Sequence, residues 1–228
     1  MVISVHQPQY IPWLGYFEKI ARSDMFVFLD NVQYKEREFQ NRNRIRTDKG
    51  WMWLTVPVIT SEGGRIRMSE VQIDNTMPWQ RKHLGSIKTS YAAAPYFNEY
   101  FQFFEETLQK QWLKLSDLNV AIVRFIMDKL SITTPTIFES ELDVMTAKTE
   151  RIIDICKRLN ADTYLSGVGA KDYLDESLFP ANKITLYYQH FDHPEYRQCF
   201  EPFMPYMSAI DLLFNHGPAS RDLLLKSG

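Results

Sequence analysis

The order of hydrophobic and polar positions at the start of the chain predicts a strand, a helix and a second strand. Residues 2–5 form a short apolar run, residues 13–21 carry apolar side chains at helical spacing, and residues 25–29 form a second continuous apolar run. Pro8 and Pro12 place a non-helical loop after the first run. A strand, a helix and a strand in this order predict a βαβ unit, whose two strands are parallel.

The middle of the chain has a different pattern. Residues 51–58 and 65–74 read as two strands separated by Glu62, Gly63 and Gly64, which predicts an antiparallel hairpin inserted after the second strand. Three helices are then expected, over residues 78–91, 96–113 and 115–130.

The last third of the chain returns to alternating strands and helices. Strands are expected at residues 136–139, 163–165 and 184–188, and helices at residues 148–159 and 207–215. The whole pattern predicts one α/β domain over residues 1–228, with a central parallel, Rossmann-like sheet. Residues 48–75 form its inserted β-hairpin and residues 78–131 its α-helical section.

Composition limits the classes of protein that fit. The 228 residues are 45% hydrophobic and carry a net charge of −2, which excludes a disordered chain and gives no general attraction to nucleic acid. An anion site must therefore be local. The first 17 residues are uncharged but lack the basic start of a signal peptide, no apolar stretch is long enough to span a membrane, and cysteine is scarce. These features predict a cytoplasmic protein without a membrane span.

Polar residues and glycines follow four of the predicted strands. In an open parallel sheet, ligands bind outside the carboxyl ends of the strands, so these residues are expected to meet at one edge. They are His6 and Gln7; Asp30, Asn31 and Gln33; Ser166, Gly167 and Gly169; and Gln189, His190, Asp192 and His193.

Two of these groups have alternative interpretations. Gly167 and Gly169, between a strand and an expected helix, fit either backbone contacts to a phosphate or a tight turn with positive φ. His6 fits either a general acid/base or a structural histidine bonded to a backbone carbonyl. His190 and His193 with Asp192 lack a distant further ligand, so no metal site is predicted.

Residues 35–46 form the strongest local charge feature. Basic side chains outnumber acidic ones there, and Asn41 lies among Arg42, Arg44 and Arg46. Arginine binds phosphate or carboxylate through two parallel hydrogen bonds, while a solvated charged loop is the alternative.

Several motifs together resemble the WbqC-like protein family. They are residues 6–17 (HQPQYIPWLGYF), 30–34 (DNVQY), 41–44 (NRNR), 164–170 (YLSGVGA), 193–198 (HPEYRQ) and 207–215 (MSAIDLLFN). The resemblance implies a bacterial protein associated with surface-polysaccharide and O-antigen synthesis, with a transferase role, and an α/β fold of the nucleotidylyltransferase type. The paired-histidine H-x-G-H motif of that fold type is absent, and residues 12–15 (PWLG) stand in its place.

Two functions follow from the residues and the resemblance. The first is a transferase or ligase acting on a nucleotide-activated amino sugar, with ATP or a nucleotide sugar as the bound nucleotide. His6 then acts as acid/base, Asp30 or Asp192 orients the acceptor, and Tyr10, Trp13, Tyr16 and Tyr34 line a sugar or base platform. The expected binding residues are Gln7, Tyr10, Trp13, Gln33, Tyr34, Asn41, Arg42, Arg44, Ser166, Gly167, Gly169 and His193.

The second function is non-catalytic binding of a glycan or a partner protein in the same aromatic-lined cleft. Single-stranded nucleic-acid binding would need a continuous basic groove, which the balanced charge does not favour. The expected partner is therefore a small nucleotide or sugar.

Overall fold

Five parallel strands form the centre of the protein in a computed structural model, which describes residues 1–60 and 66–226. Their order across the sheet is β7-β2-β1-β8-β9. The strands are β1 (Val2–His6), β2 (Met25–Phe28), β7 (Thr136–Phe138), β8 (Thr163–Ser166) and β9 (Thr185–Tyr188). Every pairing in the sheet is parallel, so the predicted parallel strands and the α/β, Rossmann-like class are confirmed.

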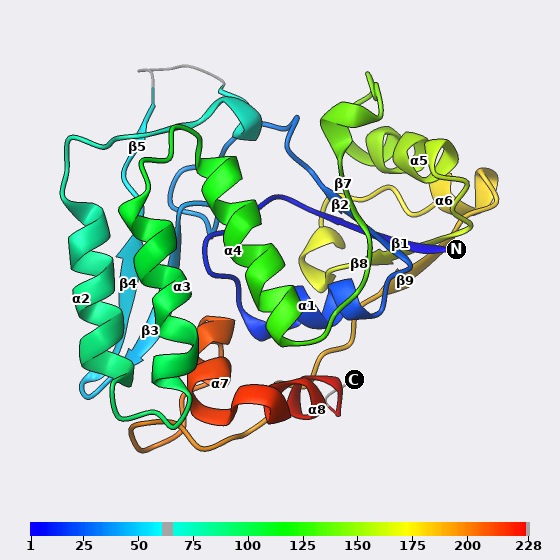
Figure 1. The fold of residues 1–228 in the computed structure, drawn as a ribbon. Coiled ribbons are helices and arrows are strands. Elements are labelled where there is room, and N and C mark those ends of the chain that lie inside the picture. The colour runs from blue at the N-terminus through cyan, green and yellow to red at the C-terminus, as the bar shows by residue number, and fades with distance from the viewer. Residues whose placement is uncertain (61–65, 227–228) are drawn as a thin grey trace.

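Helices cover both faces of this sheet because successive side chains point to opposite faces of each strand. On β2, Phe26 and Phe28 pack into the same core as α1 (Leu14–Ala21). Val27 between them packs into a second core, with side chains of α5 (Lys148–Arg158) and α6 (Leu178–Ala181). Figure 1 shows α5 and α6 together on one side of the sheet, away from α1.

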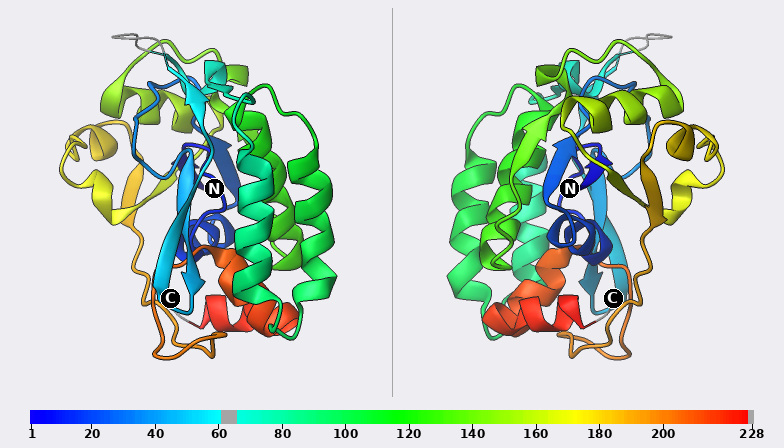
Figure 2. Two further views of the ribbon diagram at one scale, coloured as in Figure 1. Left: turned by 90° about the vertical axis from the view of Figure 1, so that its left-hand side faces the viewer. Right: turned by 90° about the vertical axis from the view of Figure 1, so that its right-hand side faces the viewer.

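The predicted helical section forms a separate layer. It contains α2 (Trp79–Tyr91), α3 (Phe97–Gln109) and α4 (Leu115–Lys129), close to the expected ranges. Figure 2 shows these helices side by side against the long β-hairpin. The chain ends with α7 (Ala209–His216), as expected, and with α8 (Ser220–Leu225), which the sequence pattern did not predict.

The predicted hairpin pairs differently from expectation. The long hairpin joins β3 (Arg42–Thr47) to β4 (Gly50–Thr55), whereas β5 (Val58–Ile59) and β6 (Gln72–Ile73) pair over two residues each. Residues 51–55 therefore pair with part of the arginine-rich segment, for which anion binding and a solvated charged loop were the two alternatives. The glycines at 63 and 64 lie outside the described residues.

The reason is the alternation within β3. Asn43 and Ile45 are fully buried, while Arg42 and Arg44 lie on the other face, above the indole rings of β4. Charged side chains that cover aromatic rings on one face of a hairpin look like a solvated loop in the sequence. Within residues 1–60 and 66–226, every helix is too short or too polar to cross a lipid bilayer.

Candidate functional site

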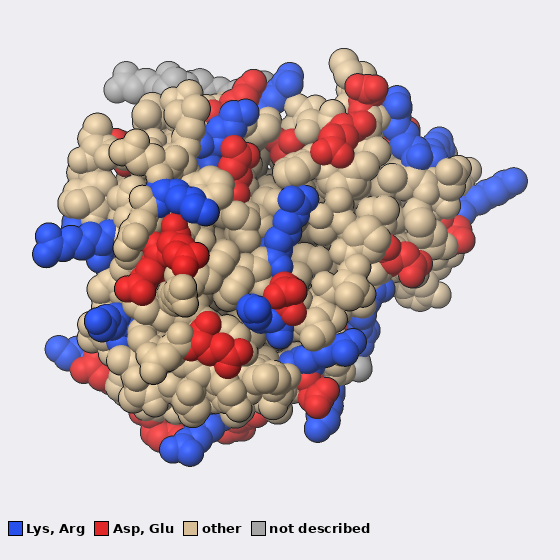
Figure 3. All heavy atoms as spheres, in the orientation of Figure 1, with Lys and Arg blue, Asp and Glu red and all other residues tan. Residues whose placement is uncertain are grey.

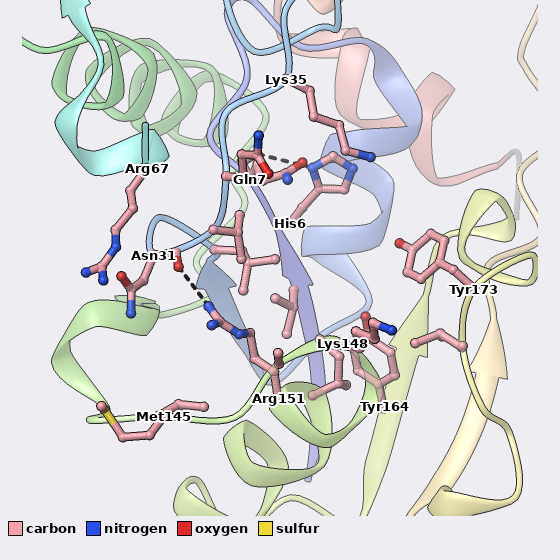
Figure 4. Close-up of a pocket in the computed structure, with 18 residues that line it drawn as sticks. His6, Gln7, Asn31, Lys35, Arg67, Met145, Lys148, Arg151, Tyr164 and Tyr173 are labelled. Carbon is pink, nitrogen blue, oxygen red and sulfur yellow. Dashed lines mark hydrogen bonds between the residues drawn. The ribbon is translucent and has the colours of Figure 1, made fainter. Parts of the chain in front are cut away.

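A cavity of about 750 Å³ lies beside the carboxyl ends of β1 and β2. His6 and Gln7 at the end of β1, Asn31 and Gln33 after β2, and Tyr164 of β8 are among the residues that line it (Figure 4). Strand β1 lies between β2, which follows it in the chain, and β8, so the strand order reverses beside β1. The site thus lies where open α/β sheets bind ligands, as the strand-end pattern predicted.

Basic side chains surround this cavity. They are Lys35, Arg67, Lys148 and Arg151, and none of the described residues that line the cavity is Asp or Glu. Figure 4 shows these cations arranged around the opening, with Tyr173 across from them. On the face shown in Figure 3, by contrast, Lys and Arg are interspersed with Asp and Glu. The cavity is therefore a local concentration of basic side chains within a protein of nearly balanced charge.

Backbone pairing holds one of these cations in place. The segment containing Arg67 lies antiparallel to the chain that follows β2, with a bridge between Gln33 and Arg67. The amide of Tyr34 donates to the Ile66 carbonyl at 2.9 Å, and the amide of Met68 donates to the Val32 carbonyl at 2.9 Å. Arg67 was missed as a site residue because this pairing is set by tertiary structure.

Arg151 is the most firmly held cation of the site. Its Nη1 donates to Glu139 Oε1 at 2.7 Å and to the Asn31 carbonyl at 2.8 Å, and its Nε donates to the Thr146 carbonyl at 2.9 Å. The Glu139 side chain is fully buried, and this burial raises its pKa even though Arg151 opposes the shift. Arg151 therefore joins α5 to the loop after β2 and places the guanidinium of a buried ion pair at the cavity wall.

The protonation of His6 follows from its surroundings. Nδ1 lies 3.1 Å from the Gln7 carbonyl, which can only accept, so Nδ1 carries the proton. Nε2 is therefore a hydrogen-bond acceptor, and it has no hydrogen-bond partner among residues 1–60 and 66–226. Burial and, second, the charge of Lys19 lower the pKa of His6 to about 3. The imidazole is neutral at pH 7, which suits a hydrogen-bond acceptor and makes it a poor base.

A second cavity, of about 380 Å³, lies beside the first and shares His6 with it. Trp13, Lys19, Gly167 and Gln189 line this second cavity. Trp13 packs against Phe191 and Tyr206, with ring centroids 5.5 and 5.9 Å apart. Its six-membered ring lies directly on Gly15, where a Cβ atom would come within 2.3 Å of the ring.

The glycine loop after β8 differs from both interpretations of the sequence. Gly167 lies in this second cavity with φ of −71°, and neither Gly167 nor Gly169 has a positive φ, so the tight turn with left-handed glycines is wrong. The expected helix is only a three-residue 3₁₀ turn, Val168–Ala170. No α-helix therefore begins at Gly167 whose N-terminus could bind a phosphate. Ser166 is buried at the end of β8.

Lys19 is a site residue that the sequence analysis missed. It is only 3% exposed, and its Nζ donates to the Val5 carbonyl at 3.3 Å. Burial lowers the pKa of Lys19 to about 7, although the charge of Glu18 opposes the shift. The sequence did offer one signal: Lys19 lies in the helix that follows the first strand, and residues 14–20 of that helix are all buried. A charged side chain in so buried a helix needs a polar partner or a cavity.

The remaining candidate acids and His193 do not reach the cavities. The Asp30 carboxylate accepts from the Ser140 hydroxyl at 2.6 Å and its amide at 3.0 Å, so it fixes the turn before α5. Asp192 is exposed and pairs with His190 at 3.3 Å. His193 donates from Nδ1 to the Pro194 carbonyl and accepts from the Tyr206 amide at Nε2, so it connects the segment around residue 193 to the segment around residue 206. The expected roles of these residues in binding or orienting a substrate lose their geometric basis.

Three further candidates hold the fold together. Tyr10 is fully buried and bonds His83 Nδ1 through its hydroxyl at 2.8 Å, and Tyr34 is buried in the same core. The Asn41 side-chain amide donates to the Val56 carbonyl at 2.9 Å. Tyr10 and Tyr34 therefore do not form the expected platform, which is left to Trp13 and to Tyr16 at the second cavity.

The arginines of the charged segment do not meet the strand ends. Arg42 lies 4.4 Å above the Trp53 ring and Arg44 lies 5.2 Å above the Trp51 ring. Arg46 is buried, and its guanidinium donates to the carbonyls of Thr47, Gly50 and Pro202. These arginines do not line the cavity beside His6, whose cations come from other segments of the chain.

No group of three or more metal-ligating side chains comes together within the described ranges 1–60 and 66–226. The chain matches the model of the WbqC-like protein family over residues 7–223. It is also 35% identical over 224 residues to "Uncharacterized protein Rv1507c" of Mycobacterium tuberculosis (strain ATCC 25618 / H37Rv), an alignment that covers 97% of this chain and 96% of that one. No solved structure matches the chain.

Proposed function

Because this chain belongs to the WbqC-like protein family, we propose that it is a transferase or ligase acting on a nucleotide-activated amino sugar in bacterial surface-polysaccharide synthesis. The observation that carries the proposal is the cation-lined cavity at the carboxyl edge of the parallel sheet. Its volume of about 750 Å³ lies within the usual range for small-molecule sites, roughly 300–1,000 Å³.

The cations fit the charge of a nucleoside diphosphate. Arg67 supplies a guanidinium group, which can bind phosphate oxygens in pairs. Arg151, whose Nε and Nη1 are already engaged, adds the N–H groups of Nη2, and Lys35 and Lys148 add point charges. As the bond to the phosphate breaks, negative charge grows on the leaving group. Cations fixed beforehand around that position stabilise this charge more than they stabilise the bound substrate, which is the requirement for catalysis.

Neutral groups at the same edge fit a sugar. The side chains of Gln7, Asn31 and Gln33 line the cavity, and amides can both donate to and accept from sugar hydroxyls. His6 Nε2 offers a further acceptor where the two cavities meet. These groups orient the activated sugar, while the cations hold its phosphates.

The test is nucleotide binding to the full chain, measured by isothermal titration calorimetry with UDP, UDP-N-acetylglucosamine and ATP. We expect at least one of them to bind, with an affinity that falls as salt rises because the cations around the cavity are partly exposed. Combined Lys35→Gln, Arg67→Gln and Lys148→Gln substitutions should weaken binding roughly a hundredfold, about 2.7 kcal/mol.

The matched control substitutes Lys110→Gln, Lys157→Gln and Arg158→Gln, three exposed cations that do not line the cavity. This control should bind like the unaltered protein. Equal loss in both variants would mean that only net charge matters, and no binding of any nucleotide would remove the nucleotide from the proposed function.

A non-catalytic glycan binder is the second candidate, favoured by the aromatic walls of the second cavity. A glycan binder should still bind sugar after the cations around the larger cavity are substituted, and it should form no transfer product. Mass spectrometry after incubation with UDP-N-acetylglucosamine and D-glucosamine would separate the two candidates.

A further inference from the structure

Lys19 brings a cation into the second cavity without a carboxylate to neutralise it. Its side chain leaves α1 toward β1, and its Nζ lies 4.0 Å from the position that a Cβ on Gly167 would take. The Val5 carbonyl accepts one of its N–H groups, and among the described residues no carboxylate lies within ion-pair distance of Nζ. A buried ammonium left in this state is costly to the fold, so its place beside a cavity needs a functional reason.

The neighbouring carboxylate is engaged elsewhere. Glu18 forms an ion pair with Arg22 and accepts a hydrogen bond from the Gln189 side chain, which also donates to the Gly15 carbonyl at 2.7 Å. These contacts hold Glu18 against the loop after β9. The other titratable side chains that line the cavity with Lys19 are His6 on β1, Tyr16 on α1, and His190 and Tyr206 in the segment after β9.

We propose that the second cavity binds the sugar that accepts the transferred group, and that Lys19 removes the proton from the nucleophilic hydroxyl or amine of that sugar. The inference rests on the proposed function, since it needs an activated donor in the cation-lined cavity. The two cavities share His6, so donor and acceptor would meet at the carboxyl end of β1.

The step balances with the groups present. The free amine of Lys19 takes the proton, and the electron pair released on the acceptor oxygen or nitrogen forms the new bond to the electrophilic carbon of the donor. The bond from that carbon to the phosphate oxygen breaks, and its electron pair leaves with the nucleotide phosphate beside Arg67 and Arg151. Lys19 then returns its proton to solvent.

Lys19 suits this role better than His6. With its pKa lowered to about 7, Lys19 has both its neutral and its protonated form populated near neutral pH. His6 has a pKa lowered to about 3, so the proton of this neighbouring pair resides on Lys19. His6 Nε2 can then accept a hydrogen bond from a hydroxyl of either sugar substrate and so orient that substrate.

The walls of the cavity indicate a pyranose ring. Trp13 is partly exposed there and is braced by Phe191, at 82° between ring planes, and by Tyr206. Sugar rings bind proteins by placing their C–H groups on aromatic faces, while their hydroxyls reach polar groups. A volume of about 380 Å³ is at the small end of the ligand-pocket range, which suits a single ring.

Lysine-selective ¹³C NMR of the full chain tests the inference without requiring turnover. The Cε resonance of Lys19, assigned by its loss in Lys19→Arg, should titrate near pH 7 and should shift saturably when D-glucosamine or methyl glucoside is added. Trp13→Leu should weaken this sugar binding by roughly tenfold, about 1.4 kcal/mol. Lys157→Met, an exposed substitution on α5, should leave the Lys19 resonance and its sugar response unchanged.

UDP binding, measured separately by calorimetry, distinguishes this inference from the proposed function. If UDP binds but neither sugar moves the Lys19 resonance, the acceptor site is wrong while the nucleotide site stands. If UDP fails to bind but the sugars shift Lys19 and depend on Trp13, the proposed donor site is wrong and the sugar site stands. A Lys19 midpoint in the ordinary lysine range, about 10.4, would overturn its role as proton acceptor.

Discussion

Replacing Arg151 by Met should destabilise the fold by leaving a buried carboxylate alone. The Glu139 side chain is fully buried, and the Arg151 side chain is 16% exposed. Removing one partner of a buried ion pair typically costs about 3–5 kcal/mol, because the remaining charge stays out of water. In a chain of this length, such a loss lowers the melting temperature by roughly 6–20 °C.

The pH dependence of the loss can be worked out from Glu139. Burial already raises its pKa in the folded protein, and removal of Arg151, which opposes that shift, raises the pKa further. A carboxyl group with a raised folded-state pKa binds protons more tightly in the native state, so native stability increases as pH falls through that pKa. The Arg151→Met defect should therefore be smaller at about pH 5 than at about pH 8.

The assay is urea unfolding followed by circular dichroism, applied to Arg151→Met, Glu139→Gln and the double variant at both pH values. Neutralising Glu139 removes the unpaired charge, so the double variant should recover most of the stability that Arg151→Met loses. Arg158→Met, an exposed cation on the same helix, is the control and should stay within about 0.5 kcal/mol of the unaltered protein. An Arg151→Met defect that is independent of pH and unrelieved by Glu139→Gln would refute this reasoning.

Three further outcomes are expected. Gly15→Ala should displace the Trp13 ring and cost about 1–3 kcal/mol, seen as a changed tryptophan emission and a lower unfolding midpoint; an unchanged emission would contradict the close contact. Burial lowers the pKa of His6 to about 3 and that of His83 to about 4, so below about pH 6.5 both bind protons mainly in the unfolded state. The stability of the protein should therefore fall as pH drops from about 6.5 to 4, and it should fall less steeply in His83→Gln. Equal slopes of melting temperature against pH in the two proteins would contradict this. Burial raises the pKa of the Cys156 thiol to about 12, so iodoacetamide at neutral pH should label Cys156 only after unfolding, as mass spectrometry of digests would show.

The parallel sheet was predictable because its strands carry a simple signal. Continuous apolar runs such as residues 25–29 mark strands that are buried on both faces, and their polar ends marked the edge where the cavity lies. His6, Gln7 and Gln33 were found in this way. A hairpin was predicted, but the pairing of β3 with β4 was not, because Arg42 and Arg44 acquire their strand environment from the tryptophans of the partner strand.

The cations of the site were hidden for a related reason. Arg67 reaches the cavity through antiparallel pairing with the segment after β2, and Arg151 reaches it from α5, far along the chain. Nothing local distinguishes these residues from surface cations. The arginine-rich segment gave the stronger local signal, but its guanidiniums stack on indoles and bond backbone carbonyls.

The central place of β1 has a consequence for how this chain is synthesised. β1 leaves the ribosome before the other strands of its sheet. It pairs on one side with β2, which follows shortly, and on the other with β8, which begins at Thr163. Until that strand emerges, the inner edge of β1 has unpaired backbone groups, and the two cavities that share His6 lack the walls contributed by β8 and the loop after it. Nascent chains that stop before Thr163 should therefore depend on chaperones. The larger cavity cannot be complete until Leu174 has been translated, and the second cavity cannot be complete until Tyr206 has been translated.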